Sequence, residues 1–507
     1  GGKGGILIND SSSPNLPLLN QGKLVIGPNG GVMAATTNTS LTVGQNIEFG
    51  SNELVIGHAD AFDGLPARLG TVTLSGGFAS TAEAGSRILV ITNAVLRNGY
   101  ESIPDVTDII LEGILWFGNQ EAVGSLSGGG KVILGSTLTV GRNDKSTVFS
   151  GNLAAGHAFV KAGTGRFDIV SSVTNHGAFY VSGGTLAFSG DGRQMTNTGT
   201  AAYTVYDGGT FLLDNTEVNE TNRLAGALPG ITFRGGAFQF IGHDGEASGE
   251  ELGAATFEGG ASAIDVINGL GAGSSAELRF SAAALGAGTI AFTATNGTLG
   301  ATGDNPRVYF NSGLTLGAIV PYATVGRAPA FYDATYGIRA YTLEEGTEFD
   351  GTSLQQTTLD TTYTANNNHL PLIAGKTVNS IWIDSPGAGC AVNLATNILM
   401  ITSGRIRLTG NDDFEFVRAA GSQVYLGGTR YYINVEEPGT TLRLGVPLVT
   451  GNNAVSKDGA GTLIFDSTNT FTGGLIINDG MAKYGPDGDL TNGPLVIWGD
   501  GVFDMSG

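Results

Sequence analysis

The sequence predicts an all-β protein, a parallel β-solenoid built from many short coils. Apolar or β-branched runs of three to five residues recur along the chain and are bounded by glycine or asparagine. Three strand-like runs open with a glycine pair at Gly183, Gly208 and Gly235, so that successive runs begin 25 and 27 residues apart. These intervals correspond to one to one and a half coils of a parallel β-solenoid.

Length and composition agree with a solenoid and argue against other repetitive chains. A chain of 507 residues is too long for one compact core, whereas a solenoid grows lengthwise by adding coils. The 83 glycines follow no strict period and only 15 prolines accompany them, which excludes collagen. A hydrophobic fraction of 41% is also too high for a disordered Pro/Gly-rich chain.

The charge balance argues against two classes of partner. The 25 basic and 45 acidic residues give a net charge of -20, and such a surface repels phosphate groups. We therefore expect no nucleic-acid partner and no binding to anionic membranes. No apolar run approaches the roughly 18 residues of a membrane helix, so no membrane span is expected. The start at Gly1-Gly2-Lys3 shows no signal-peptide pattern, and we expect a processed chain or a segment of a longer one.

Residues 1–124 are expected to form the first coils. Runs such as Leu41–Gly44, Glu53–Gly57 and Arg87–Ile91 are short and end at or near glycine or asparagine. Glycine permits the positive φ that tight bends between strands often require.

Residues 125–313 carry the most regular repeats, including the three glycine-pair strands. Lys161–Gly165 places a lysine and a Gly-Thr-Gly turn directly before a strand. Only Glu250–Ala255 and Ala282–Leu285 are compatible with a helical turn.

Residues 314–377 are interpreted as an excursion from the solenoid. Two prolines and five aromatic residues crowd Leu314–Tyr341, which has few glycine-bounded strands, and a polar stretch from Thr352 to His369 follows. Insertions on a rigid rod often carry function, so this segment is either a structural patch or a contact surface.

Residues 378–507 are expected to resume the coils. Thr462–Phe465 and Leu475–Ile477 are strand-like and flank a polar, hydroxyl-rich segment, and two such strands need about one coil. Lys457–Gly461 presents the same lysine and Gly-small-Gly turn as Lys161–Gly165. A single coil leaves its strand edges open, so it is stable only between similar coils.

This repeat resembles the passenger-associated repeats of bacterial autotransporters and of the large surface proteins that share them. The family repeat runs Lys-x-Gly-x-Gly-Thr-Leu-x-Leu, then Asn-Thr-Tyr-Thr-Gly-Gly-Thr, then an apolar strand and Gly-Thr-Leu. Lys457–Leu463 and Asn469–Gly474 match it, with Phe471 in the tyrosine place, whereas Met481-Ala482 departs from Thr-Leu.

Further segments are similar to parts that recur in the large members of that family. They are Leu138–Gly165, Leu213–Asn215 with Asn222–Leu224, Ala318–Val325, Asn379–Ile381 and Leu399–Gly404. The resemblance implies a right-handed parallel β-helix exported to the cell surface, and it implies no particular activity.

Side chains capable of chemistry are scattered along the chain. Acidic pairs occur at Glu250-Glu251, Glu344-Glu345, Asp412-Asp413 with Glu415, and Glu436-Glu437. Neighbours on a strand point to opposite faces, so these pairs are interpreted as solvated turn charges rather than paired catalytic carboxylates. The five histidines, His58, His157, His176, His243 and His369, show no metal-ligand spacing.

We therefore predict no catalytic, cofactor-binding or metal-binding residues and no cofactor. The Gly-Asp-rich turn Gly485–Asp489 lacks the nonapeptide repeat of calcium-binding β-rolls and is interpreted as structural, with calcium left open. Cys390 is the single cysteine, which rules out an intrachain disulfide, and it is interpreted as a core residue.

These observations predict one elongated rod without enzymatic activity. With ~22 residues per coil and ~4.8 Å between stacked strands, we expect about 23 coils and a length on the order of 100 Å. The predicted function is structural, as an extracellular stalk, coat or head-to-tail filament on a bacterial cell surface, with further copies of the chain or other surface components as partners. The alternative is an adhesin or carbohydrate-binding passenger that contacts glycans through residues 321–341. A β-helical polysaccharide-degrading enzyme ranks third.

Overall fold

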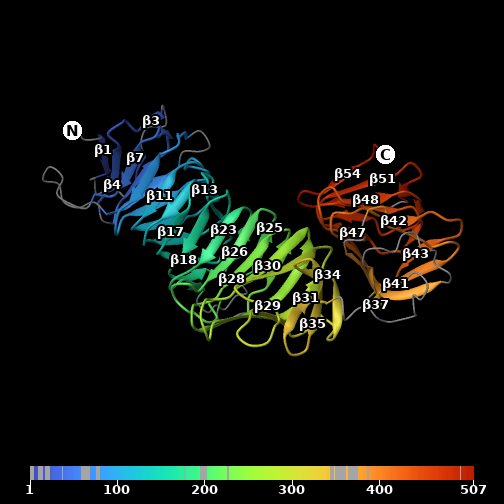
Figure 1. Cartoon of the computed structure of the whole chain (residues 1–507). Helices are drawn as coiled ribbons and strands as arrows, with labels where there is room; N and C mark the ends of the chain where they lie inside the picture. The colour runs from blue at the N-terminus through green and yellow to red at the C-terminus, as the bar shows by residue number, and fades with distance from the viewer. Residues whose placement is uncertain are drawn as a thin grey trace. The chain divides into compact units, whose positions relative to one another are not determined.

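In the computed structural model the chain folds into strands and turns that stack as a solenoid (Figure 1). The structure describes residues 5–9, 15–17, 23–36, 38–58, 69–75, 80–175, 177–194, 202–224, 228–342, 347–348, 361–363, 375–384, 388–490 and 493–506. No helix occurs within these ranges, and parallel sheets form a β-solenoid of about 17 turns. The predicted all-β solenoid is confirmed.

The chain divides into two compact units. The first comprises Gly1–Thr232, Ala237–Ala254 and Ile267–Ser281, and the second comprises Phe233–Gly236, Ala255–Val266 and Ala282–Gly507. The division into 1–124, 125–313, 314–377 and 378–507 that the sequence suggests stays a prediction.

Two long sheets begin in the first coils, and their neighbouring strands pair in parallel. The first has the order β1 (Gly5–Asn9), β4 (Gly31–Ala35), β7 (Glu53–Ile56), β9 (Arg87–Val90), β11 (Asp108–Leu111), β14 (Ser125–Ser127). The second has the order β2 (Asn15–Pro17), β5 (Ser40–Val43), β8 (Thr71–Leu74), β10 (Val95–Asn98), β12 (Ile114–Phe117), β15 (Lys131–Leu134), β18 (Asn152–Ala155), β21 (Ser172–Asn175), β24 (Arg193–Gln194). A short pair joins β3 (Lys23–Val25) to β6 (Asn46–Glu48).

Two further sheets follow. One has the order β13 (Glu121–Val123), β16 (Leu138–Val140), β19 (Phe159–Lys161), β22 (Phe179–Val181), β25 (Tyr203–Tyr206), β27 (Ile231–Arg234), β29 (Ala247–Gly259), β31 (Ser275–Leu285), β33 (Arg307–Phe310). The other has the order β17 (Thr147–Phe149), β20 (Arg166–Ile169), β23 (Gly184–Phe188), β26 (Gly209–Asp214), β28 (Ala237–Ile241), β30 (Ala261–Ile267), β32 (Thr289–Thr295), β34 (Ala318–Val325), β35 (Ala328–Asp333), β36 (Gly337–Ala340).

Three sheets form the C-terminal coils. One has the order β37 (Thr347–Glu348), β38 (Thr361–Tyr363), β39 (Lys376–Asp384), β41 (Ile398–Thr409), β44 (Tyr431–Val435), β47 (Val455–Asp458), β50 (Leu475–Ile477), β53 (Leu495–Ile497), with β43 (Gln423–Leu426) between β41 and β46 (Leu448–Val449). The second has the order β40 (Ala391–Asn393), β42 (Phe414–Val417), β45 (Thr441–Leu444), β48 (Thr462–Phe465), β51 (Met481–Tyr484), β54 (Val502–Asp504), and the third pairs β49 (Thr468–Asn469) with β52 (Asp489–Leu490).

The core consists of columns in which one inward-facing side chain per coil stacks on its equivalent in the next. Along most strands burial alternates with a period of two, as in β20 and β28, because successive side chains point to opposite faces. Phe159, Phe179 and Tyr203 occupy one such column, with ring centroids 5.9 and 5.1 Å apart. Stacking of this kind buries each coil against its neighbours.

Coil length varies more than expected. The register partners Phe159 and Phe179 are 20 residues apart, whereas Thr210 and Ala237 are 27 apart and Ile290 and Ala323 are 33 apart. The expectation of about 23 coils is therefore wrong, since it assumed ~22 residues in every coil, and about 17 turns are present.

Both segments that seemed compatible with a helical turn are strands. Glu250–Ala255 lies within β29 and Ala282–Leu285 lies at the end of β31. Their alanine and glutamate residues favour helices, but intrinsic propensity is weak compared with pairing to the neighbouring strands, which decides the outcome.

The segment Leu314–Tyr341 continues a sheet. β34 pairs in parallel with β32, then β35 and β36 fold back as antiparallel strands. These two pairs are antiparallel among the otherwise parallel pairings described, so the expected departure from the regular coil is a meander attached to the sheet.

The two strand-like runs of the C-terminal repeat, Thr462–Phe465 and Leu475–Ile477, fold as expected. Thr462–Phe465 is β48 and Leu475–Ile477 is β50, and each pairs in parallel with strands of the coils before and after it. Cys390 is buried in the hydrophobic core of these coils, as interpreted. The described part of the chain contains no helix that could span a membrane.

Candidate functional site

A lysine lies inside the solenoid at the first Lys-x-Gly-x-Gly turn. Lys161 of β19 is fully buried in an inward-facing column, with a valine above and below it. Its Nζ donates to the carbonyl oxygens of Ala162 at 2.6 Å, Gly163 at 3.0 Å and Gly183 at 3.2 Å. Burial lowers the pKa of this ammonium to about 8, and the charge of Asp144 acts in the opposite direction.

A second lysine repeats this arrangement in the C-terminal coils. Lys457 of β47 is fully buried between two isoleucines of its column. Its Nζ donates to the carbonyl oxygens of Asp458 at 2.9 Å, Gly459 at 2.5 Å and Asp479 at 3.1 Å. Burial again lowers the pKa to about 8, against the nearby carboxylates. Because neither amine reaches solvent, both lysines hold turns together and neither is placed to act as a nucleophile.

The asparagine of the repeat is also a buried structural residue. Asn469 is fully buried, its Oδ1 accepts the N–H of Leu448 at 2.9 Å, and its Nδ2 donates to the carbonyls of Ser467 at 2.7 Å and Asp489 at 3.1 Å. One amide therefore satisfies backbone groups of three coils.

A fully buried arginine joins two segments that the family resemblance had singled out. Arg223 Nε donates to Asn215 Oδ1 at 2.6 Å. Its two Nη atoms donate to four backbone carbonyls between 2.6 and 2.9 Å, those of Gly190, Gly192, Asp214 and Val218. All five donors of the guanidinium fork are thus used within the protein.

The acidic pair Glu250-Glu251 is split between two faces of β29, as predicted for strand neighbours, but the interpretation as solvated turn charges is wrong for Glu250, which is buried within the strand. Glu251 is exposed, whereas Glu250 is buried and its carboxylate accepts the N–H groups of Arg223 at 2.8 Å and Leu224 at 2.9 Å. Burial raises the pKa of Glu250 to about 8, although these hydrogen bonds oppose the shift. The carboxyl fixes a turn and is closed to substrate.

A second buried carboxyl lies in the first unit. Oε2 of Glu121 accepts from Asn98 Nδ2 at 3.0 Å, from the N–H and Oγ of Ser102 at 2.9 and 3.2 Å, and from the N–H of Ile103 at 3.3 Å. Its Oε1 and Asn98 Oδ1 are buried without a hydrogen-bond partner among the described residues. Burial raises the pKa of Glu121 to about 7, with Asn98 opposing and Glu101 adding to the shift.

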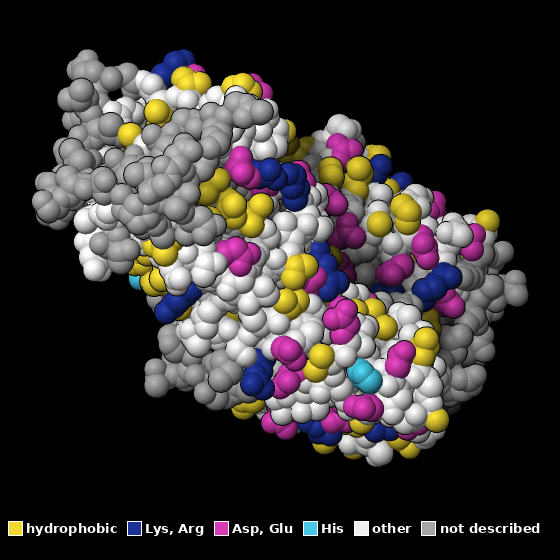
Figure 2. Space-filling view, turned by 90° about the vertical axis from the view of Figure 1, so that its left-hand side faces the viewer, with side chains coloured by type: hydrophobic (Ala, Val, Ile, Leu, Met, Phe, Trp, Pro, Cys, Tyr) yellow, Lys and Arg dark blue, Asp and Glu magenta, His cyan; other side chains and the backbone are white. Residues whose placement is uncertain are grey.

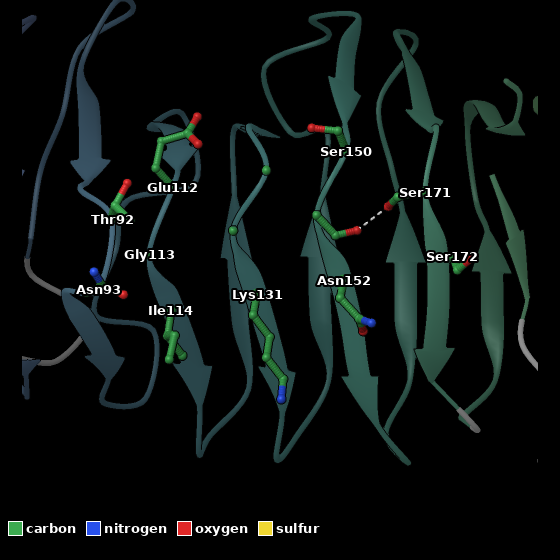
Figure 3. Close-up of a pocket in the computed structure, with 13 residues that line it drawn as sticks. Thr92, Asn93, Glu112, Gly113, Ile114, Lys131, Ser150, Asn152, Ser171 and Ser172 are labelled. Carbon is green, nitrogen blue, oxygen red and sulfur yellow. Dashed lines mark hydrogen bonds between the residues drawn. The ribbon is translucent and has the colours of Figure 1, made fainter. Parts of the chain in front are cut away.

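A groove crosses five successive coils on the outside of the first unit (Figure 3). Its volume is about 400 Å³, and it is lined by Thr92, Asn93, Glu112, Gly113, Ile114, Gly129, Gly130, Lys131, Ser150, Gly151, Asn152, Ser171 and Ser172. Four of these residues, Ile114, Lys131, Asn152 and Ser172, are the first residues of β12, β15, β18 and β21. The groove thus follows the corner at which successive strands of one sheet begin.

A column of glycines forms the floor of the groove. A Cβ on Gly113 would lie 2.4 Å from the carbonyl oxygen of Ala94, one on Gly130 would lie 2.4 Å from that of Gly113, and one on Gly151 would lie 1.8 Å from that of Gly130. The backbones of successive coils therefore approach too closely here for any side chain. Glu112 and Lys131 extend to opposite sides of this column in Figure 3.

The remaining acidic and histidine residues that the sequence brought forward do not converge. Glu344-Glu345, His176 and His369 lie outside the described residues. Within the described ranges no three His, Cys, Asp or Glu side chains gather in a way that could hold a metal ion. On the face drawn in Figure 2, Asp and Glu side chains are spread out, several of them beside Lys or Arg. Asp487 of the turn Gly485–Asp489 pairs with Arg418.

The aromatic residues of segment 321–341 mostly face inward. Tyr332 and Tyr341 are buried, and the hydroxyl of Tyr332 donates to the carbonyl of Phe310 at 2.5 Å and accepts its N–H at 3.0 Å. Arg339 covers the ring of Phe331 at 4.2 Å from the centroid. These rings therefore contribute to packing rather than to an open contact surface.

Sequence reasoning missed the groove and the buried carboxyls. Glu121 opens a short strand like many solvated acids in this chain, and only the tertiary packing buries it. The groove depends on residues that come together once the coils stack, and the signal available beforehand was the glycine at one position of successive coils, Gly113, Gly130 and Gly151.

Comparison with known proteins agrees with the repeat. Residues 455–481 match the family model described as the passenger-associated-transport-repeat, which confirms the resemblance found in the sequence at that repeat. No curated protein and no solved structure matches the chain. The repeat and the β-solenoid fold together support a surface passenger domain.

Proposed function

We propose that this chain, which carries a passenger-associated-transport-repeat, is a non-enzymatic structural protein of a bacterial cell surface that stacks end to end with further copies of itself. The repeat at residues 455–481 and the solenoid fold support the surface role. Buried ionisable groups such as Lys161, Arg223 and Lys457 bind backbone atoms of neighbouring coils, which supports a structural role.

The observation that carries the stacking proposal is the apolar surface of β53, the last strand described in its sheet. Leu475 and Ile477 of β50 are 2% and 0% exposed, whereas their register partners Leu495 and Ile497 of β53 are 46% and 47% exposed. Leu495 and Ile497 therefore present apolar side chains that a further coil would cover, and we call these two residues the terminal apolar face.

The first and last coils offer matching strand edges. β1, β2 and β3 begin their sheets, while β52, β53 and β54 end theirs, so three strands at one end face three at the other in a stack of copies. Unpaired parallel edges bind further strands, and a contact between different ends does not close and so extends into a fibre.

The test is the assembly state of the full chain as its concentration rises. We expect sedimentation velocity to show species that lengthen with concentration, and electron microscopy to show end-to-end rods. Leu495→Lys/Ile497→Lys should keep the protein monomeric, because charges at the terminal apolar face would have to be desolvated. The control Val148→Lys/Leu270→Lys changes two exposed apolar residues elsewhere and should assemble like the wild type. A wild-type chain that stays monomeric at every concentration would refute the stacking.

The adhesin alternative receives less support at residues 321–341, since Tyr332 and Tyr341 are buried there. A polysaccharide-degrading enzyme ranks below both, because the described carboxyl pair Glu250-Glu251 points to opposite faces.

A further inference from the structure

We propose that the groove of the first unit binds a neutral linear oligosaccharide laid across the coils. The groove spans five coils, and a spacing of ~4.8 Å between stacked strands gives it a length of about 20 Å. A volume of about 400 Å³ lies within the range of ligand sites, and the elongated outline suits a short stretch of polymer better than one compact molecule. This inference does not depend on end-to-end stacking.

One half of the groove holds polar groups that the protein itself does not use. Among the described residues the side chains of Thr92, Asn93, Glu112 and Lys131 make no hydrogen bond or ion pair. They supply a hydroxyl, an amide, a carboxylate and an ammonium, which together donate and accept hydrogen bonds. Sugar hydroxyls do both as well, so a polyhydroxylated ligand matches this set.

The hydroxyls in the other half are already engaged. Thr174 Oγ1 donates to Asn152 Oδ1 at 3.1 Å, Ser150 Oγ donates to the carbonyl of Gly128 at 3.3 Å, and Ser171 Oγ donates to the carbonyl of Gly151. We therefore place the main contacts at Thr92, Asn93, Glu112 and Lys131, with the glycine floor allowing a ligand to approach the backbone.

An apolar strip begins at Ile114, which lines the groove. Trp116 does not line the groove but continues the strip two residues further along β12, on the same outward face of the sheet. The guanidinium of Arg97 lies over the Trp116 ring at 4.4 Å from its centroid, which holds the indole in place. A sugar ring has apolar C–H faces as well as hydroxyls, and this pairing of an apolar strip with unused polar groups fits both.

The charges in the groove and on the whole chain favour a neutral sugar over an acidic one. The groove contains one carboxylate and one ammonium, Glu112 and Lys131, so its own charges cancel. The net charge of -20 on the chain disfavours the approach of a polyanion. A neutral chain suffers no such repulsion.

The test uses defined oligosaccharides and the full chain. Cellohexaose, laminarihexaose, chitohexaose and mannohexaose are titrated into the protein by isothermal calorimetry, with hexagalacturonate as the acidic comparison. We expect at least one neutral hexasaccharide to bind and hexagalacturonate to bind at least tenfold more weakly. Glu112→Ala/Lys131→Ala should weaken the neutral ligand at least tenfold, since both side chains are exposed and their loss leaves the fold unchanged.

A matched control separates a local effect from a general one. Glu415→Ala/Lys483→Ala removes the same two charges from the outer face of the C-terminal coils and should bind like the wild type. The proposal is overturned if no neutral hexasaccharide binds at millimolar concentration, if the acidic one binds best, or if both double variants bind equally. Because the readout is binding by one chain, failure here leaves the end-to-end assembly test untouched.

Discussion

Lys161 and Lys457 make the same three hydrogen bonds at two places in the solenoid. Each ammonium binds the carbonyl of the next residue, that of the residue after it, and that of a residue 22 positions further on in the following coil. Each also occupies an inward-facing position that the coil before it fills with an aliphatic side chain. The lysine of the repeat is therefore a clamp that closes its own turn and ties it to the next coil.

The first prediction concerns the loss of this clamp. Lys457→Met keeps the apolar stem but leaves three carbonyls without their donor, so we expect the affected coils to lose about 1–3 kcal/mol of stability. Hydrogen exchange should accelerate in β47 and β50 while β5 and β8 stay protected, because solenoid coils are stabilised by their nearest neighbours. Lys483→Met, on an outward-facing position, serves as the control. Equal protection in both variants would contradict the clamp.

The second prediction concerns alkaline pH. The pKa of each clamp lysine is about 8 in the folded chain and 10.5 in the unfolded chain, so between these values the unfolded state binds the extra proton. The free energy of unfolding should therefore rise with pH from about 8 to about 10.5, by about 1.4 kcal/mol for each unit by which a pKa is lowered.

Denaturation curves at pH 7.5 and 10 measure this effect. The difference between wild type and Lys161→Met/Lys457→Met isolates the two lysines from other groups that titrate in this range. A difference that is independent of pH would mean that the three carbonyls stabilise the ammonium as much as burial destabilises it.

The third prediction concerns Glu121. Its pKa is about 7 in the folded chain against 4.5 unfolded, so the folded state holds the extra proton between these values. The stability that this carboxyl contributes is fully present below about pH 4.5 and is lost as pH rises through about 7. Glu121→Gln stays neutral and should gain thermal stability relative to wild type between pH 5 and pH 8. Glu251→Gln, at an exposed carboxylate, should show no such trend.

The fourth prediction concerns Arg223. Replacing it by methionine removes the hydrogen bonds that Arg223 donates to four backbone carbonyls and to Asn215 Oδ1, and the loss of a buried hydrogen-bonded ion of this kind costs about 3–5 kcal/mol. Arg223→Lys should recover little, because an ammonium cannot reproduce the planar fork. Arg193→Met, at an exposed arginine paired with Glu220, should stay within about 0.5 kcal/mol of wild type in urea denaturation. Similar losses of stability in Arg223→Met and Arg193→Met would contradict a stabilising role for the hydrogen bonds of Arg223.

The fifth prediction concerns the glycine floor of the groove. Gly151→Ala would place a Cβ 1.8 Å from the carbonyl of Gly130, so the coils must separate and the melting temperature should fall by several degrees. Gly156→Ala has open space around the added methyl and should melt like the wild type. Indistinguishable melting curves would mean that the coils relax at the corner without strain.

The sequence predicts what depends on local pattern and period. Strand length, glycine punctuation and the two Lys-x-Gly-x-Gly turns led to the solenoid, and Thr462–Phe465 and Leu475–Ile477 are strands as expected. Glu250–Ala255 was misjudged because its residues favour a helix locally, while pairing within β29 decides the outcome.

What could not be predicted depends on contacts between coils. Nothing near Glu121 in the sequence shows that Asn98 and Ser102 will surround it, since both belong to the preceding coil and its turn. The same holds for the five donors of Arg223 and for the groove, whose lining comes from residues spread over 80 positions between Thr92 and Ser172. Coil length was also misjudged. Ile290 and Ala323 are register partners 33 residues apart, and nothing in the local sequence pattern shows that this coil is longer than the others.

The stacking of equivalent residues in columns also determines which changes of length the gene can tolerate. Removing or duplicating one complete coil leaves every later inward-facing side chain on the inward face of its strand. Removing one residue from a strand instead turns the following side chains to the opposite face. Insertions and deletions in related genes should therefore occur in whole coils or at the turns between strands.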